Sequence, residues 1–216
     1  MHENMSTSMT VLNLDENQIQ SLPVNALDPL RTLTHLHVTG NNITSLEAAL
    51  ASQNSTLKHL DVSHNAISQT HAQFFAHLFN MEVIVLNHNA LQVLPDFGDA
   101  ASVLRDVRVA HNNIDALNTS HLLQFDAIVA LQVTNNPFDC FPSLSGTPLV
   151  LTLEQLRVNG LNLGDSCPDR PLAELAVLSY LEAINSGLET IPDMSAKGTA
   201  GRSAAESESP CKHHSS

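Results

Sequence analysis

The stretch LKHLDVSHNAI at residues 57–67 decides the fold, because the same pattern returns along most of the chain. It fits L-x-x-L-x-L-x-x-N-x-L. The second apolar position falls at Leu12, Leu36, Leu60, Ile84, Val107 and Leu131, with spacings of 24, 24, 24, 23 and 24 residues. An asparagine follows five residues later each time, at Asn17, Asn41, Asn65, Asn89, Asn112 and Asn136. A fixed period of this length predicts a stack of similar coils.

Each part of the repeat has a structural interpretation. Alternation such as Leu60 and Val62 has a period of two, so it predicts a short strand with one face inward. Successive coils then pair their strands in parallel, about 5 Å apart. The asparagine side chain is expected to bond backbone groups of the turn and of the next coil, a structural role rather than a catalytic one. Further apolar positions line the return segments: Leu27, Leu30, Leu33; Phe75, Leu78, Met81; Leu122, Phe125, Ile128.

The pattern loosens after Asn136 but persists in two more units. Leu161 and Ser186 stand where asparagine is expected in the seventh and eighth. From about Met9 to Pro192 the chain resembles the leucine-rich repeat family. The resemblance implies an α/β fold: a right-handed, horseshoe-shaped solenoid of about eight coils with a parallel concave β-sheet.

The domain organisation follows from the extent of the repeats. We expect a disordered start at residues 1–8 and a solenoid over 9–192, with six regular repeats to about 141 and two irregular repeats over 142–192. Residues 193–216 are rich in Ser, Ala, Glu and Lys and predict a disordered tail. Residues 1–8 do not read as a signal segment, and we expect a fragment of a longer protein.

Composition narrows the possible partners. The chain has 9 basic and 22 acidic residues and a net charge of -13, which argues against nucleic acid and against anionic membrane surfaces. No stretch approaches the roughly 20 consecutive apolar residues of a membrane helix. No phosphate-binding loop, nucleophile elbow or H-E-x-x-H motif is present, so we expect neither enzymatic activity nor a cofactor. A protein ligand remains.

The outward strand positions of the concave sheet form two columns, which we call the concave face. One column runs Val11, His35, His59, Val83, Asp106, Ala130, Gln155, Tyr180; the next runs Asn13, His37, Asp61, Val85, Arg108, Gln132, Arg157, Glu182. Val83 and Val85 suggest a small apolar spot within a polar rim. We predict ligand contacts at His35, His37, His59, Asp61, Val83, Val85, Asp106, Arg108 and Gln132.

Histidine is enriched at two places. His35, His37 and His59 join Asp61 on the concave face, and a second column, His64, His88 and His111, lies just before the asparagines. Imidazoles bind metals and titrate near pH 6.5, so metal binding and pH sensing are both open. The alternative is a variable surface position that happens to be histidine. We predict no metal site on spacing alone.

Cysteines and sequons bear on the compartment. Cys140 and Cys167 occupy nearly equivalent points of adjacent coils, which places them within disulfide range; two buried free thiols are the alternative. The string at residues 136–140 resembles the opening of the C-terminal cap of extracellular leucine-rich repeat proteins, although Phe141 departs from that pattern. Glycosylation candidates are Asn42, Asn54 and Asn118. A secreted or cell-surface recognition protein is expected; an intracellular scaffold or regulatory subunit is the alternative.

Overall fold

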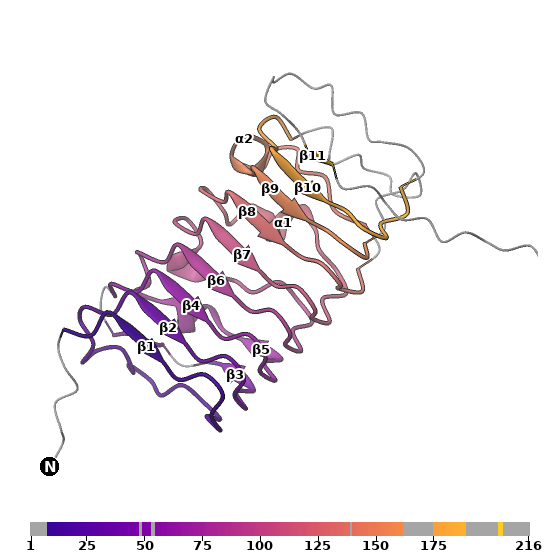
Figure 1. Ribbon diagram of the computed structural model, residues 1–216. Coiled ribbons are helices and arrows are strands. Elements are labelled where there is room, and N and C mark those ends of the chain that lie inside the picture. Colours follow the sequence, from indigo (N-terminus) through magenta and orange to yellow (C-terminus); the bar gives the residue numbers. More distant parts are fainter. Residues whose placement is uncertain are drawn as a thin grey trace, which may run out of the picture.

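The computed structural model describes residues 8–47, 49–52, 55–138, 140–161 and 175–188, together with the backbone of residues 203–204. These residues form a parallel β-solenoid, in which one short strand per coil adds to a single sheet that runs along the molecule (Figure 1). Its strands are β1 (Val11–Asn13), β2 (His35–His37), β4 (His59–Asp61), β6 (Val83–Val85), β7 (Asp106–Arg108), β8 (Ala130–Gln132), β9 (Gln155–Arg157), β10 (Tyr180–Glu182) and β11 (Ser203–Ala204).

The strand register follows the repeat. Leu12 pairs with Leu36, Leu36 with Leu60, and Leu60 with Ile84, and the same in-register pairing continues to Leu181. These central residues point into the solenoid and are almost fully buried from Leu36 to Leu156. The predicted parallel solenoid is therefore confirmed, with about six regular turns followed by the looser coils of β9 and β10.

The return segments contain less helix than an α/β fold suggests. They hold 3-10 helices η1 (Ala72–Phe75) and η2 (Gly98–Ala100), helices α1 (Thr119–Leu122) and α2 (Leu149–Thr152), and a small sheet of β3 (Ser45–Leu46) and β5 (Gln69–Thr70). A repeat of about 24 residues leaves little chain for a long helix once strand and turns are formed. Inside them, Phe75, Phe97 and Phe125 contact one another in succession, with ring centroids 5.1 and 5.7 Å apart.

The asparagine ladder connects each coil to its neighbour. Asn112 donates from Nδ2 to the carbonyls of Leu86, Val109 and Ala110, and its Oδ1 accepts from the Leu91 amide at 3.0 Å. Equivalent bonds surround Asn41, Asn65, Asn89 and Asn136. The inter-coil bonds reach the preceding coil, not the next one as the sequence suggested, because the carbonyl of the residue just after each strand, such as Leu86, faces the coil that follows it.

The two ends of the ladder differ from its middle. Asn17 is exposed and bonds only within its own turn, to the carbonyls of Leu14 and Asp15. Ser186 replaces asparagine in the eighth coil, and its buried hydroxyl donates to the carbonyl of Val158 at 3.1 Å. In the seventh coil Leu161 fills the place and is buried as an apolar residue.

Most of the two chain ends that were predicted to be disordered is not described by the structure. Residues 1–7 and most of 193–216 lie outside the described residues. Within the predicted tail, Ser203 and Ala204 pair in parallel with β10, and disorder of the tail as a whole stays a prediction. An edge strand offers unpaired backbone groups, and a short segment can pair with them whatever its side chains are. The amino-acid composition of the segment does not reveal such pairing.

The ladder yields a matched prediction. Asn112→Ala would leave the buried Leu91 amide and three carbonyls without this partner, so we expect it to cost about 3 kcal/mol or more of unfolding free energy. Asn17→Ala removes the same side chain at the exposed first coil and should cost about 1 kcal/mol or less. Urea unfolding followed by circular dichroism measures both. Equal losses would show that the ladder does not stabilise the stack.

Candidate functional site

The concave face is built by the first and third residues of each strand. Because strand side chains alternate, these positions point away from the core while the central residue is buried. The parallel register aligns them in lateral rows, for example His37 beside Asp61 and Val85 beside Arg108. All nine predicted ligand-contact residues lie on strands β2, β4, β6, β7 and β8 of this one sheet.

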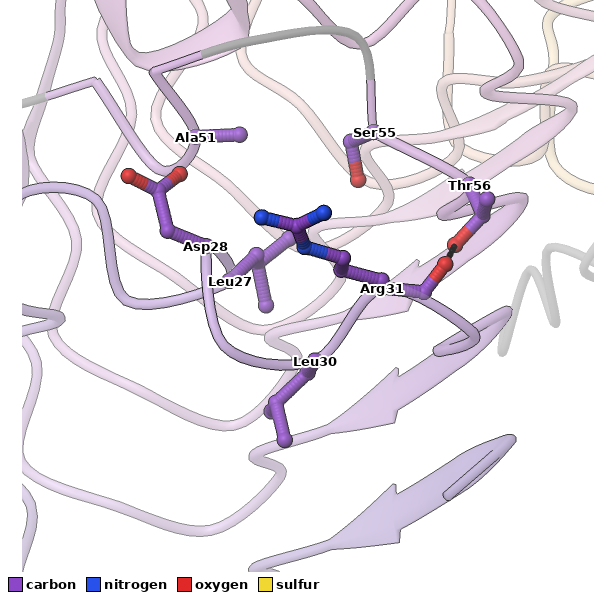
Figure 2. A pocket seen from close by; sticks show the side chains of 7 residues that line it. All are labelled: Leu27, Asp28, Leu30, Arg31, Ala51, Ser55 and Thr56. Carbon is purple, nitrogen blue, oxygen red and sulfur yellow. Dashed lines mark hydrogen bonds between the residues drawn. The ribbon is translucent and has the colours of Figure 1, made fainter. Parts of the chain in front are cut away.

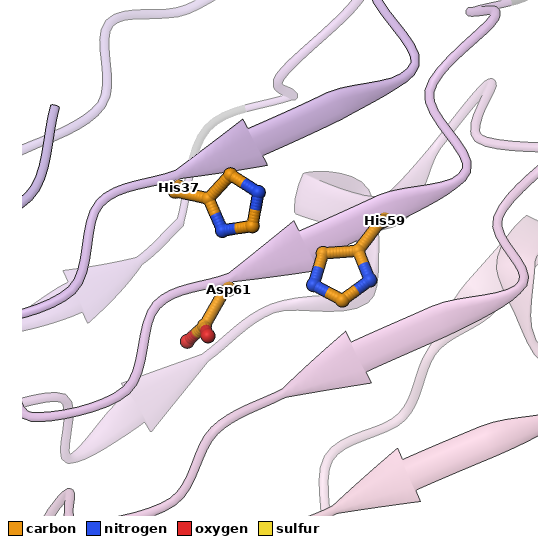
Figure 3. A group of neighbouring side chains, drawn as sticks. All are labelled: His37, His59 and Asp61. Atoms are coloured by element: carbon orange, nitrogen blue, oxygen red, sulfur yellow. The ribbon is translucent and has the colours of Figure 1, made fainter. Parts of the chain in front are cut away.

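The N-terminal part of this face is a histidine cluster, comprising His35, His37, His59 and Asp61. The ring centroids of His37 and His59 are 5.2 Å apart, and those of His35 and His59 are 5.6 Å apart. The ligand atoms of His37, His59 and Asp61 all lie within 4.8 Å of one another (Figure 3). The cluster therefore brings two imidazoles and a carboxylate from adjacent strands into one small area.

Hydrogen bonds orient two side chains of this cluster, and burial shifts the pKa of a third. Asp61 Oδ1 accepts from the Ser63 amide at 2.9 Å and from its hydroxyl at 2.6 Å. His35 Nδ1 lies 2.9 Å from the Thr34 hydroxyl. Burial lowers the pKa of His59, and the charge of His37 lowers it further, against the opposing effect of Asp61. Ser63 thus orients the Asp61 carboxylate from one side, and the His59 imidazole favours its neutral form.

The valine spot is smaller than the sequence suggested. Val83 is half-buried, but Val85 is only 6 % exposed. In the sheet, Val85 lies between Asp61 and Arg108, whose longer side chains stand on either side of it. A short side chain between two long ones is shielded even on an outward face, so Val85 offers little surface to a ligand.

The centre of the face holds an ion pair. Arg108 donates to Asp106 through Nε and Nη2, with contacts of 3.1, 3.1 and 2.6 Å. This hydrogen bonding raises the pKa of Arg108, so the guanidinium stays charged. Gln132 is half-buried in the same lateral row, next to Arg108. The pair fixes a planar cation on the surface at the middle of the sheet.

A second polar cluster lies further along, on β9 and β10, beyond the predicted contact residues. Arg157 Nε is 3.2 Å from Glu182 Oε2, and the guanidinium carbon lies 5.3 Å from the centre of the Tyr180 ring. Tyr180 donates to Glu182 at 2.8 Å. A hydrogen bond from Asn159, with those from Tyr180 and Arg157, lowers the pKa of Glu182. These residues occupy the same two columns, so the column assignment contained the signal that would have found them.

Backbone geometry explains why histidine occurs in the column formed by His64, His88 and His111. Their rings stack with centroids 4.2 Å apart in both pairs. All three have positive φ, at 52°, 55° and 55°, and so do the residues at the equivalent place in the other coils: Glu16, Gly40, Asn135, Gly160 and Asn185. This turn position requires a left-handed conformation, which Gly, Asn and His adopt more readily than most residues. The enrichment of histidine is therefore compatible with turn geometry alone.

The compartment markers lie away from the concave face. Asn42 and Asn118 are exposed, and Asn118 caps α1 by accepting from the His121 amide. Asn54 lies outside the described residues. Cys140 is disulfide-bonded, whereas Cys167 lies outside the described residues, so the pairing of the two remains a prediction.

A pocket of about 240 Å³ lies in the return segments of the first coils, lined by Leu27, Asp28, Leu30, Arg31, Ala51, Ser55 and Thr56 (Figure 2). Two of its polar side chains, Asp28 and Thr56, already have protein partners. Asp28 accepts from the amide and hydroxyl of Ser52, and the Thr56 hydroxyl contacts the carbonyls of Arg31 and Leu33. No predicted site residue lines it, and we assign it no ligand.

The stacked histidines predict a pH effect on stability. Burial and the charges of His111 and His64 lower the pKa of His88, so between its folded and unfolded pKa values the unfolded chain binds more protons. Stability is therefore retained above the ordinary histidine pKa of about 6.5 and lost as pH falls through it. His88→Asn keeps a residue suited to positive φ, as Asn135 shows. Its unfolding free energy should fall less steeply from pH 7.5 to 5 than that of the parent; parallel profiles would contradict this.

The described residues include no helix that is both long and apolar enough to cross a membrane. No curated protein matches the chain in sequence. Residues 31–91 and 55–105 match the family described as Leucine rich repeat.

Several solved structures are similar to the chain in fold. The crystal structure of human 5T4 (Wnt-activated inhibitory factor 1, Trophoblast glycoprotein) matches with a TM-score of 0.63 and 23% identity, over 84% of this chain and 72% of that one. The APL1 leucine-rich repeat domain gives 0.60 and 18%, over 86% and 52%, and TLR13 in its complex with ssRNA13 gives 0.61 and 20%, over 89% and 26%. Repeat sequence, stacked coils and shared fold agree: residues 31–105 match the leucine-rich repeat family, and the described chain folds as a leucine-rich repeat solenoid with repeats of about 24 residues.

Proposed function

We propose that the chain is a protein-recognition module that binds a polypeptide ligand on the concave face, as part of a secreted or cell-surface protein. The observation that carries the proposal is the continuous, in-register sheet, which fixes charged, aromatic and imidazole side chains in two columns along its length. A solenoid of this kind presents an extended and rigid surface with little cost of ordering on binding.

The chemistry of the face favours a polypeptide. Arginine and tyrosine are enriched among residues that dominate binding energy at protein interfaces, and Arg108, Arg157 and Tyr180 all lie on this surface. Asp106 and Glu182 already balance the charges of Arg108 and Arg157. A ligand therefore meets ion pairs rather than a basic strip. The net charge of -13 opposes a nucleic acid ligand, although the TLR13 structure named above is a complex with ssRNA13.

Three features support an extracellular location. Asn42 and Asn118 are exposed sequon residues, Cys140 is disulfide-bonded, and structural disulfides belong to oxidising compartments. 5T4, which shares the fold, is itself named a glycoprotein. A role as part of a larger receptor or adhesion protein belongs to the same proposal. An intracellular scaffold or regulatory subunit is the alternative, because the fold by itself does not fix the compartment.

Binding can be tested with a matched pair of charge reversals. The full chain is screened against an array of secreted and cell-surface ectodomains. For a captured ectodomain, Arg108→Glu on the concave face should weaken affinity by about 30-fold, as for an interface hot spot. Arg31→Glu makes the same change in a return segment and should leave affinity unchanged. A loss with Arg31→Glu but not with Arg108→Glu would contradict the assignment of the face.

The compartment is tested on protein isolated from its native source. Enzymatic deglycosylation converts occupied Asn42 and Asn118 to aspartate, which peptide mass mapping detects, and non-reducing mapping should recover the Cys140 and Cys167 peptides as one species. Unmodified asparagines together with two free thiols would favour the intracellular scaffold.

A further inference from the structure

Three side chains of the histidine cluster form a compact donor set that spacing alone did not reveal. We infer that His37, His59 and Asp61 bind one divalent transition-metal ion, of which Zn²⁺ is the class that fits best, on the concave face between β2 and β4. This inference is independent of the ligand-binding role proposed above, because metal binding can be measured without any protein partner.

The geometry supports the assignment. A tetrahedral ion bound at about 2.0–2.2 Å holds its ligand atoms roughly 3.4 Å from one another. The ligand atoms of the three residues already lie within 4.8 Å of one another (Figure 3). Side-chain rotations that move these atoms by about 1 Å therefore complete the site. The backbone is well placed for this, because His59 and Asp61 share one face of β4 and His37 pairs directly with Asp61.

The chemistry of the donors selects the metal. Two imidazole nitrogens and one carboxylate oxygen suit zinc and its neighbours, whereas Ca²⁺ and Mg²⁺ require mostly oxygen ligands. Three protein ligands leave a coordination position for water or for an incoming group. The three ligands are half-buried, so that position opens onto the concave face.

The surroundings orient the ligands. Ser63 fixes Asp61 through Oδ1, which leaves Oδ2 to coordinate the ion. His35 is close, but its Nδ1 lies at the Thr34 hydroxyl and its ring stacks on His59 at an interplanar angle of 22°. We assign His35 as a neighbour that limits rotation of the His59 ring and not as a ligand, which makes it the natural control.

The site is tested by titrating the full-length chain, made without an oligohistidine tag, with Zn²⁺ in a calorimeter. The wild-type chain should bind one Zn²⁺ at this site. His59→Gln and Asp61→Asn should each weaken that binding by at least about ten-fold. His35→Gln on the same strand pair and His88→Asn in the stacked column should retain it, and Ca²⁺ or Mg²⁺ should give no comparable binding.

Two readouts keep the result independent of folding. Circular dichroism melts of the metal-free variants verify that each is folded, and Zn²⁺ should raise the melting temperature of the wild type and of His35→Gln but not of His59→Gln. Co²⁺ in place of Zn²⁺ should give the visible absorption of a tetrahedral site. The inference is overturned if Zn²⁺ does not bind, if binding survives in both His59→Gln and Asp61→Asn, or if His88→Asn abolishes it.

Discussion

The ladder of asparagine side chains is the interaction on which the rest of this protein depends. Each internal asparagine fills a turn that would otherwise bury several unpaired backbone groups, and it joins that turn to the coil before it. An amide is well suited to this role because one end donates twice and the other accepts. With the turn satisfied in this way, the strand can be only three residues long and still hold a fixed register.

The same turn also determines which residues stand beside the ladder. The position before each asparagine, and before Leu161 and Ser186 that stand in its place, takes a left-handed backbone in every described coil, from Glu16 to Asn185. That requirement favours glycine, asparagine and histidine. It accounts for three stacked imidazoles without a ligand, and it places ring against ring at 4.2 Å because the coils are in register. A histidine column in a repeat protein is therefore weak evidence for a metal unless its nitrogens converge.

The concave face differs along its length in a way that bears on the proposed role in recognition. Its N-terminal part contains imidazoles and a carboxylate, its centre an Arg108–Asp106 pair, and its far part a guanidinium against a tyrosine ring. The valine between the first two parts is shielded by their side chains. A ligand that spans the sheet thus meets three polar sites in a fixed order, which provides specificity more than bulk apolar area.

The repeat by itself determined the solenoid, the strand register, the inward residues and the two outward columns, because each depends on a period that can be counted along the chain. Tertiary structure alone decided the rest. Whether Val85 is exposed depends on the reach of Asp61 and Arg108 from neighbouring strands, and whether a histidine can share an ion depends on side-chain rotamers. The pairing of Ser203 and Ala204 with β10 depends on an unfilled sheet edge. Such features arise from contacts between residues about 24 or more positions apart, and a one-dimensional pattern specifies which residues are neighbours but not how their side chains share the space between them.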